Sequence, residues 1–378
     1  MVSQDLFVVD CDSHVMEPPD LWERYLESRF RDRAIRIVKD PVDGLETLMI
    51  DRQPLLKGVL AGLGGANLPR EELFVPGQKT YMDGCPPASY LPDERIKLLD
   101  EWSVSKGVLF PTVGILWEVA DNELASAYAR AYNNWIFDFA CSARGRVVPI
   151  AHLALQDVAS AMVELKRCLK LGFKGVFLAP ETIGGCRFSH SDFDPIWNEC
   201  QEAGIPVCLH VIVRFNRAPG IIGQFYRPGE FRTVFGFALG GFAQVVPAAM
   251  TMVADGLFDR FPRLKVLCVE AGCGWAPYIM DRMDQKNELL GWTYPLKLKP
   301  SDYFRKNIWV VAEPEERTIG AVMELLGDDH VLWGSDYPHI DSNLNAPNLI
   351  RESIARLTPD RQKKLLGENA QAVFQLRG

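Results

Sequence analysis

The sequence predicts an α/β protein that folds as a (β/α)8 TIM barrel with long insertions after strands 1 and 5. Eight short apolar segments rich in β-branched residues recur along the 378 residues. They are continuously apolar rather than alternating, which is typical of parallel strands buried on both faces. Because segments with helical spacing of apolar residues separate them, we expect strand and helix to alternate around a closed barrel.

The predicted strands are rich in Val, Ile, Leu and Phe. They cover residues 6–12, 105–112, 146–153, 173–180, 205–212, 264–272, 307–312 and 330–338. The predicted helices have apolar residues three or four positions apart, and two of them end on a glycine suited to a helix C-cap, Gly172 and Gly204. They cover residues 93–102, 122–140, 157–172, 193–204, 232–258, 274–290, 315–327, 347–356 and 359–374.

Two insertions interrupt this alternation, at residues 15–92 and 213–231. The first is rich in Gly and Pro, and the second contains Arg214, Arg217 and Arg227. Both follow the carboxyl end of a strand, where barrels build their active sites, and long loops inside a compact domain are usually functional. With no internal repeat and no linker, we expect one domain over residues 1–378.

Composition restricts the class of protein. Hydrophobic residues make up 48% and charged residues 24%, as in soluble globular proteins. The net charge of −8 without a Lys/Arg block argues against nucleic acid as a partner. We expect no apolar run of the ~18 residues that a membrane span needs, and no signal peptide. Nine cysteines without CxxC pairs favour a reduced, cytoplasmic setting.

Carboxylates and imidazoles gather where the predicted strands end. Strand side chains alternate, so every second residue of the first strand shares a face. In a barrel the strand ends converge on one point, and imidazoles and carboxylates meeting there indicate a divalent metal site. The residues concerned are Asp10, Asp12, His14, His210, Glu270, Asp336 and, three residues further on, His339.

Four motifs at these places resemble the amidohydrolase superfamily, in the branch of aminocarboxymuconate semialdehyde decarboxylase and related aromatic acid decarboxylases. The motifs are "DCDSHVMEPPDLW", "GIPVCLH", "FPRLKVLCVEAGCGWAPYIMDRMD" and "LWGSDYPH". They occur in family order and span nearly the whole chain.

The resemblance implies a divalent metal ion held by Asp12, His14, His210 and Asp336. The sequence departs from the family in two places, because the decarboxylases commonly have His in place of Asp12 and often His in place of Glu270. The extra carboxylates favour Mn²⁺ or Fe²⁺ over Zn²⁺. We expect one ion per chain, although the acidic residues would suffice for two.

Other residues have more than one interpretation. Glu270 could be a further ligand, a general acid or base, or a structural anchor. His339 could serve as proton donor, partner of a ligand or ordinary surface residue. Asp10 and Glu17 are weaker ligand candidates: Asp10 could instead find donors in the barrel floor, and Glu17 could order its loop.

The remaining site predictions concern chemistry and substrate. Asp336, with Glu270 or His339, would carry out proton transfer. Arg214 and Arg217 could clamp a substrate carboxylate, and Trp275 could line an apolar pocket wall.

The function that these residues and the resemblance predict is metal-dependent, non-oxidative decarboxylation or hydrolysis of a small carboxylated substrate, for example an aromatic one. One alternative is a monooxygenase with two Fe or Mn ions on the same fold. Another is an inactive partner subunit of a related active enzyme. The aromatic residues at 292–304 could serve a homo-oligomer or an oligomer with a related subunit.

Overall fold

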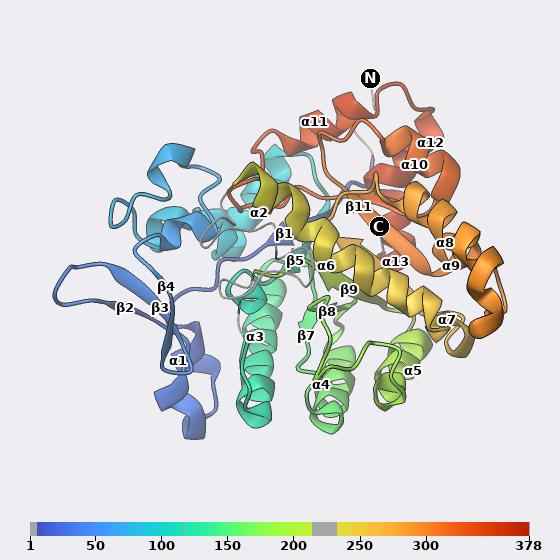
Figure 1. Ribbon diagram of the computed structural model, residues 1–378. Coiled ribbons are helices and arrows are strands. Elements are labelled where there is room, and N and C mark those ends of the chain that lie inside the picture. Colours follow the sequence, from blue (N-terminus) through green and yellow to red (C-terminus); the bar gives the residue numbers. More distant parts are fainter. Residues whose placement is uncertain (1–5, 117, 214–232, 378) are drawn as a thin grey trace.

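The computed structural model describes residues 6–116, 118–213 and 233–377, and within them the predicted strands form the barrel (Figure 1). All eight predicted strand segments are confirmed, with the third divided at Ile150 into two short pieces. The strands pair in parallel in the orders β1-β5-β6 and β12-β11-β10-β9-β8-β7. Their bounds are β1 (Val9–His14), β5 (Lys106–Phe110), β6 (Val147–Pro149), β7 (Ala151–His152), β8 (Val176–Leu178), β9 (Pro206–His210), β10 (Lys265–Val269), β11 (Ile308–Ala312) and β12 (Val331–Trp333).

The barrel closes between its first and last strands. The backbone N–H of His14 donates to the carbonyl of Tyr337 at 2.6 Å, and the N–H of Asp336 donates to the carbonyl of Asp12 at 2.8 Å. An isolated parallel bridge between Ser13 and Tyr337 lies at the same place. This β1–β12 seam joins segments more than 320 residues apart in sequence, and it lies where the two strands carry polar side chains.

The predicted helices are confirmed with bounds that differ by a few residues, and both glycine caps adopt positive φ, at +91° and +68°. In Figure 1, α3, α4 and α5 run side by side. The predicted helix at 359–374 is divided by a π-helical turn, and the short polar helix α9 was not predicted. The bounds are α2 (Pro92–Glu101), α3 (Asn122–Ser142), α4 (Val158–Leu171), α5 (Asp194–Ala203), α6 (Val234–Ala254), α7 (Leu257–Arg260), α8 (Ala276–Leu290), α9 (Pro300–Asn307), α10 (Ile319–Leu326), α11 (Ala346–Ser353), α12 (Pro359–Lys363) and α13 (Asn369–Phe374).

Helix α6 corrects one expectation. It is long and apolar enough, by length and composition, to cross a membrane, with a mean hydropathy of 1.6 over an 18-residue window. The prediction that no apolar run reaches this length is therefore wrong. A single helix of this kind is weak evidence for a membrane span, and α6 packs against β9 and β10, with a third of that window buried.

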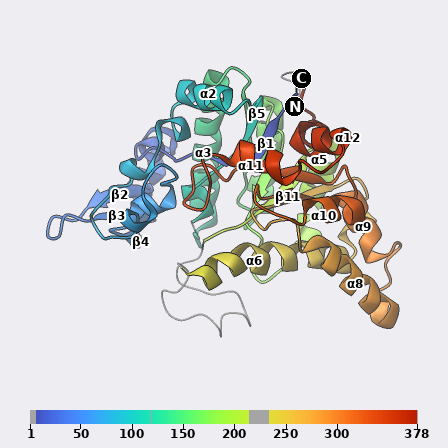
Figure 2. The same cartoon turned by 90° about the horizontal axis from the view of Figure 1, so that it is seen from above.

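The first insertion has structure of its own. It contains α1 (Leu21–Tyr25) and an antiparallel sheet of β2 (Arg36–Lys39), β3 (Glu46–Ile50) and β4 (Gln53–Lys57). This sheet projects to one side of the barrel, away from α8 and α9 (Figure 2). The insertion after the fifth strand lies outside the described residues, apart from Val213.

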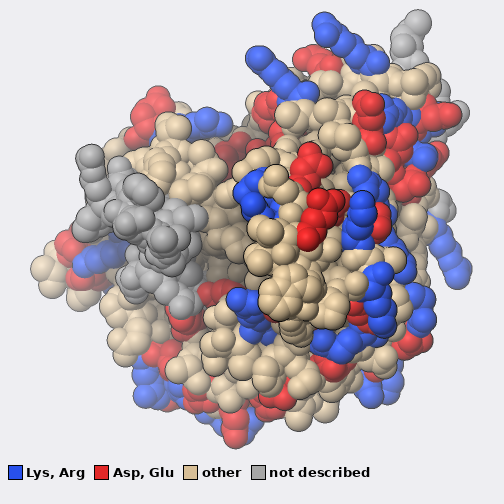
Figure 3. All heavy atoms as spheres, turned by 45° about the vertical axis from the view of Figure 1, so that its right-hand side comes forward, with Lys and Arg blue, Asp and Glu red and all other residues tan. Residues whose placement is uncertain are grey.

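Charged and aromatic side chains on the surface are relevant to the predicted partners. On the face shown in Figure 3, Lys and Arg side chains lie among Asp and Glu side chains. Within the aromatic stretch at 292–304, Trp292 is 80% exposed and Tyr294 is 60% exposed. Oligomer formation through this stretch stays a prediction.

Gly334 permits the close approach at the seam. A Cβ added at Gly334 would lie 2.2 Å from the Cβ of Asp12 and 2.9 Å from its backbone nitrogen. Since those atoms belong to a buried strand, they cannot give way without moving β1. The seam therefore tolerates no side chain at this position.

We predict that Gly334→Ala lowers the free energy of unfolding by about 1–3 kcal/mol, the usual effect of overpacking a well-packed core. Gly107→Ala, in β5, is the matched control, because its added Cβ would meet nothing closer than 3.7 Å. Urea denaturation of both variants measures the difference. Equal stability of the two variants would contradict the tight seam.

Candidate metal centre

Four side chains from three strand ends converge inside the barrel mouth. Asp12 and His14 lie on the same face of β1, His210 ends β9, and Asp336 follows β12. The Nε2 atom of His14 is 3.3 Å from Asp12 Oδ1, 3.4 Å from Asp336 Oδ1 and 3.0 Å from His210 Nε2. His210 Nε2 is 3.4 Å from Asp12 Oδ1. The structure thus brings donor atoms of Asp12, His14 and His210 within 4.8 Å of one another, with Asp336 beside His14.

Backbone carbonyls fix the orientation of both imidazoles. His14 Nδ1 lies 2.9 Å from the carbonyl oxygen of Pro111, and His210 Nδ1 lies 2.8 Å from that of Val211. A carbonyl accepts only, so each Nδ1 carries the proton and each Nε2 of the neutral ring presents a lone pair. Two lone pairs facing each other at 3.0 Å repel unless a proton or a cation lies between them.

Among the described residues, several buried carboxylate oxygens at this point have no hydrogen-bond partner. They are Asp12 Oδ1, Asp336 Oδ2 and Glu270 Oε2. Buried polar atoms are nearly always satisfied, and orphaned ones indicate an ion or water that completes the site. Neighbouring ligands of an ion bound at about 2.0–2.2 Å lie roughly 3.0–3.4 Å apart. The distances from His14 Nε2 to Asp12, Asp336 and His210, and from His210 Nε2 to Asp12, are in this range. The donor set fits a divalent metal ion.

Burial and neighbouring charges shift the pKa values of the side chains at this centre. Burial alone would raise the pKa of Asp12, but the imidazoles of His14 and His210 outweigh it and hold that pKa below its usual range. Burial raises the pKa of Asp336 well above its ordinary value, and the charge of Glu270 adds to this. Burial also lowers the pKa of His14, so its ring is neutral near pH 7, as a metal ligand must be.

Glu270 and His339 complete a second group of donors. Donor atoms of His14, Glu270, Asp336 and His339 all lie within 4.8 Å of one another. Burial raises the pKa of Glu270 well above its ordinary value. His339 Nδ1 is 2.8 Å from Asp336 Oδ1, and its Nε2 is 2.9 Å from Thr112 Oγ1. Both of its nitrogens therefore have neighbours, which suits a group that moves a proton.

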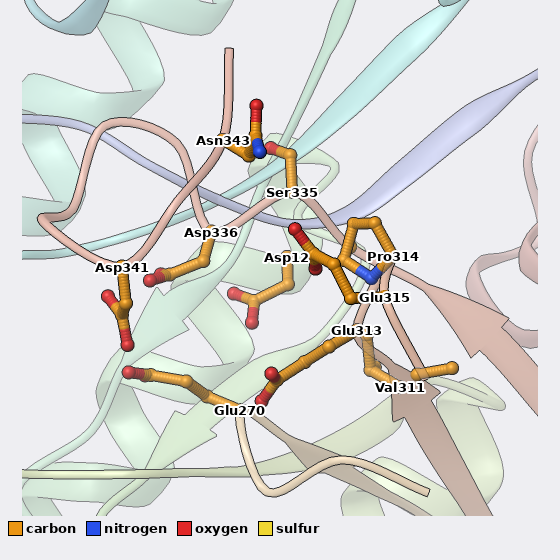
Figure 4. A pocket seen from close by; sticks show the side chains of 12 residues that line it. Asp12, Glu270, Val311, Glu313, Pro314, Glu315, Ser335, Asp336, Asp341 and Asn343 are labelled. Atoms are coloured by element: carbon orange, nitrogen blue, oxygen red, sulfur yellow. The ribbon is translucent and has the colours of Figure 1, made fainter. Parts of the chain in front are cut away.

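An acidic pocket opens beside this centre (Figure 4). Asp12, Glu270 and Asp336 line it from the site, and further carboxylates line it from the loops after β11 and β12. Burial raises the pKa of Glu313, in the β11 loop, to about 7, with Glu316 and Asp341 adding to the effect. Glu313 and Asp341 were not among the predicted site residues, although the acidic stretch "EPEE" directly follows the seventh predicted strand.

Asp10 and Glu17, the weaker ligand candidates, lie outside both donor groups. The carboxylate of Asp10 accepts hydrogen bonds from the backbone and the hydroxyl of Ser335, at 2.9 and 2.6 Å. That of Glu17 accepts from the backbone N–H groups of Thr112, Val113 and Gly114. Asp10 thus ties β1 to β12, and Glu17 orders the loop after β5.

Of the three residues predicted to contact the substrate, the structure describes Trp275 alone. Arg214 and Arg217 lie outside the described residues. Trp275 is buried, donates through Nε1 to the carbonyl of Gly272 and packs edge-on against Phe304. It is not among the residues that line the acidic pocket.

The comparison with protein families decides the identity. The family model described as "Amidohydrolase" matches residues 9–376. The chain belongs to the amidohydrolase family. This confirms the resemblance inferred from the four motifs, and the match covers every strand of the barrel.

Two curated relatives of this chain are described as decarboxylases. Gamma-resorcylate decarboxylase of Polaromonas sp. (strain JS666) is 30% identical over 301 residues, which cover 75% of this chain and 87% of that protein. The 2-amino-3-carboxymuconate-6-semialdehyde decarboxylase of Dictyostelium discoideum is 28% identical over 74% of this chain and 75% of its own.

Solved structures confirm the fold. An amidohydrolase from Mycobacterium avium subsp. paratuberculosis K-10 superposes with a TM-score of 0.76 at 20% identity, over 98% of this chain and 99% of that chain. A dihydroxybenzoic acid decarboxylase from Polaromonas sp. JS666, solved with bound manganese and the inhibitor 2-nitroresorcinol, gives a TM-score of 0.68 at 21% identity, over 99% and 98% of the two chains.

Glu17 generates a prediction about pH. Burial raises its pKa to about 7, so between the unfolded pKa and pH 7 the folded chain holds a proton that the unfolded chain has lost. Stability must then fall as pH rises through this window, by up to about 1.4 kcal/mol per pH unit. From pH 5 to 7 the metal-free wild type should lose roughly 2 kcal/mol more than Glu17→Gln.

Urea denaturation at both pH values measures this difference. Glu71→Gln, at an exposed position of the same insertion, is the control and should follow the wild type. Parallel pH dependence of the wild type and Glu17→Gln would refute the buried proton.

Proposed function

We propose that this chain is a metal-dependent, non-oxidative decarboxylase of a small aromatic carboxylic acid. The observation that carries the proposal is the convergence of four buried donor atoms, with two facing imidazole lone pairs and orphaned carboxylate oxygens. The descriptions of the curated relatives support decarboxylation. They give no support to hydrolysis, to a dinuclear monooxygenase or to an inactive partner subunit.

Asp12, His14, His210 and Asp336 would hold the metal ion. When bound, a divalent ion supplies a Lewis acid that binds and polarises the oxygens of a carboxylated substrate. Manganese is the ion we favour, because oxygen-rich donor sets suit it and because a solved decarboxylase of this fold contains it. One ion per chain would be enough for these four ligands.

The chain's own residues would bind and orient the substrate and protonate its ring. The carboxyl of Glu270, whose pKa burial raises well above its ordinary value, would donate a proton to the ring carbon that carries the carboxylate. The new C–H bond replaces the C–C bond to the carboxyl carbon, and CO2 leaves. His339 beside Asp336 can return a proton to the site. The rings of Phe110 and Phe177 pack against His210 and hold it in place.

The test is a decarboxylation assay on protein reconstituted with Mn²⁺, using a panel of hydroxylated benzoates and aminocarboxymuconate-type acids. Release of CO2 with formation of the corresponding decarboxylated ring is the expected result. Absence of turnover on every acid of the panel, with Mn²⁺ bound, would contradict the proposed reaction.

Asp336→Asn should weaken Mn²⁺ binding by more than the roughly 10–100-fold that contacts outside the ligand shell contribute, because it removes a ligand charge. Turnover should fall by a similar factor. Titration calorimetry of the metal-free protein and the CO2 assay measure the two effects. Asp281→Asn, an exposed Asp on α8, is the matched control. Unchanged Mn²⁺ affinity in Asp336→Asn would remove Asp336 from the site.

A further inference from the structure

Helix α2 carries a buried cation beside the metal centre. The side chain of Arg95 is fully buried. Its guanidinium forms no ion pair with a carboxylate of the described residues, and all of its hydrogen bonds go to neutral oxygens. Arginine stays protonated in proteins, so this position holds a full positive charge without a direct counter-ion.

The guanidinium reaches three acceptors on two segments. Nε donates to the carbonyl of Ala88 at 2.7 Å, and Nη1 donates to Ser13 Oγ at 2.7 Å. Nη2 donates to the carbonyl of His14. The guanidinium also lies over the ring of Tyr337, 5.0 Å from its centroid.

Residues that Arg95 contacts are sequence neighbours of the proposed ligands. Ser13 stands between Asp12 and His14, and Tyr337 directly follows Asp336. One side chain therefore touches both of the segments that supply three of the four proposed ligands. It does so at the β1–β12 seam, where the backbone of His14 also bonds to Tyr337.

Packing alone is a poor reason for a charge at this position. Burying an ion without a close counter-ion is costly, and an apolar side chain of similar volume is often neutral or stabilising in its place. Residues that orient metal ligands do not touch the ion themselves, yet their loss weakens metal binding. A rigid planar donor that fixes several carbonyl and hydroxyl oxygens at once is suited to that role.

We propose that Arg95 is a positioning residue for the metal site: it holds the β1 and β12 ends in register so that Asp12, His14 and Asp336 meet at one point. The inference rests on the proposed metal site but not on the identity of the substrate. It acts through the backbone and the hydroxyl of Ser13, since the guanidinium donates only to these and to the carbonyl of Ala88 among the described residues.

The experiment measures Mn²⁺ affinity by titration calorimetry and stability by urea denaturation, on metal-free full-length protein. Arg95→Met should weaken Mn²⁺ binding by about 10–100-fold, the range found for groups that orient ligands. Arg95→Lys keeps the charge but cannot reach all three acceptors, so it should show a smaller loss. The Mn²⁺ electron paramagnetic resonance spectrum of each variant should broaden as the ligand geometry becomes less uniform.

Asn369→Ala is the control for a purely structural effect. Asn369 is buried and donates to the carbonyls of Asp328 and Val331, at the opposite end of β12. This variant should lose stability and keep the wild-type Mn²⁺ affinity.

Mn²⁺ affinity of Arg95→Met within twofold of the wild type would overturn the inference while leaving the proposed function intact. If Arg95→Met does not fold, the same criterion applied to Arg95→Lys decides. If Asn369→Ala loses as much Mn²⁺ affinity as Arg95→Met, the effect of Arg95 is one of overall stability, and the inference is overturned. A wild-type chain that binds no Mn²⁺ would overturn the proposed function and this inference together.

Discussion

Closure of the barrel between β1 and β12 is the constraint on which the site depends. The backbone hydrogen bonds of this seam join Asp12 to Asp336 and His14 to Tyr337. Because the side chains of β1 alternate, fixing its backbone also fixes which residues face the barrel interior. Gly334 allows the approach, and its lack of a side chain leaves the room that Asp12 occupies. A metal-binding geometry thus follows from strand register.

Convergence of the strand ends inside this barrel creates an electrostatic problem that a cation resolves. The Nε2 atoms of His14 and His210 lie 3.0 Å apart, and carboxylate oxygens of Asp12, Glu270 and Asp336 are buried without a hydrogen-bond partner among the described residues. Burial raises the pKa of Glu270 and of Asp336 well above their ordinary values, which disfavours their charged forms in the absence of an ion. A divalent ion bound by Asp12, His14, His210 and Asp336 would offset the charge and satisfy the donor atoms. A raised pKa at Glu270 also suits the acid that the proposed decarboxylation needs.

Much of the fold was predictable from the sequence because parallel strands buried on both faces have a simple signature. The ligand candidates followed from their places at strand ends, which a barrel brings together. The antiparallel sheet of the first insertion was missed because its strands are short and half-exposed. Glu17 could not be assigned from its spacing, since its role depends on three amides almost a hundred residues away. Arg95 was missed because its helix looked like an ordinary amphipathic segment, and only the packing shows it buried.

The most direct test of the central claim is a crystal structure of the protein soaked with Mn²⁺, with anomalous diffraction recorded to locate the ion. The account predicts one peak within about 2.0–2.3 Å of Asp12, His14, His210 and Asp336, distances usual for divalent metal ligands. An anomalous peak bound by other residues, or none at this point with Mn²⁺ in excess, would contradict the account.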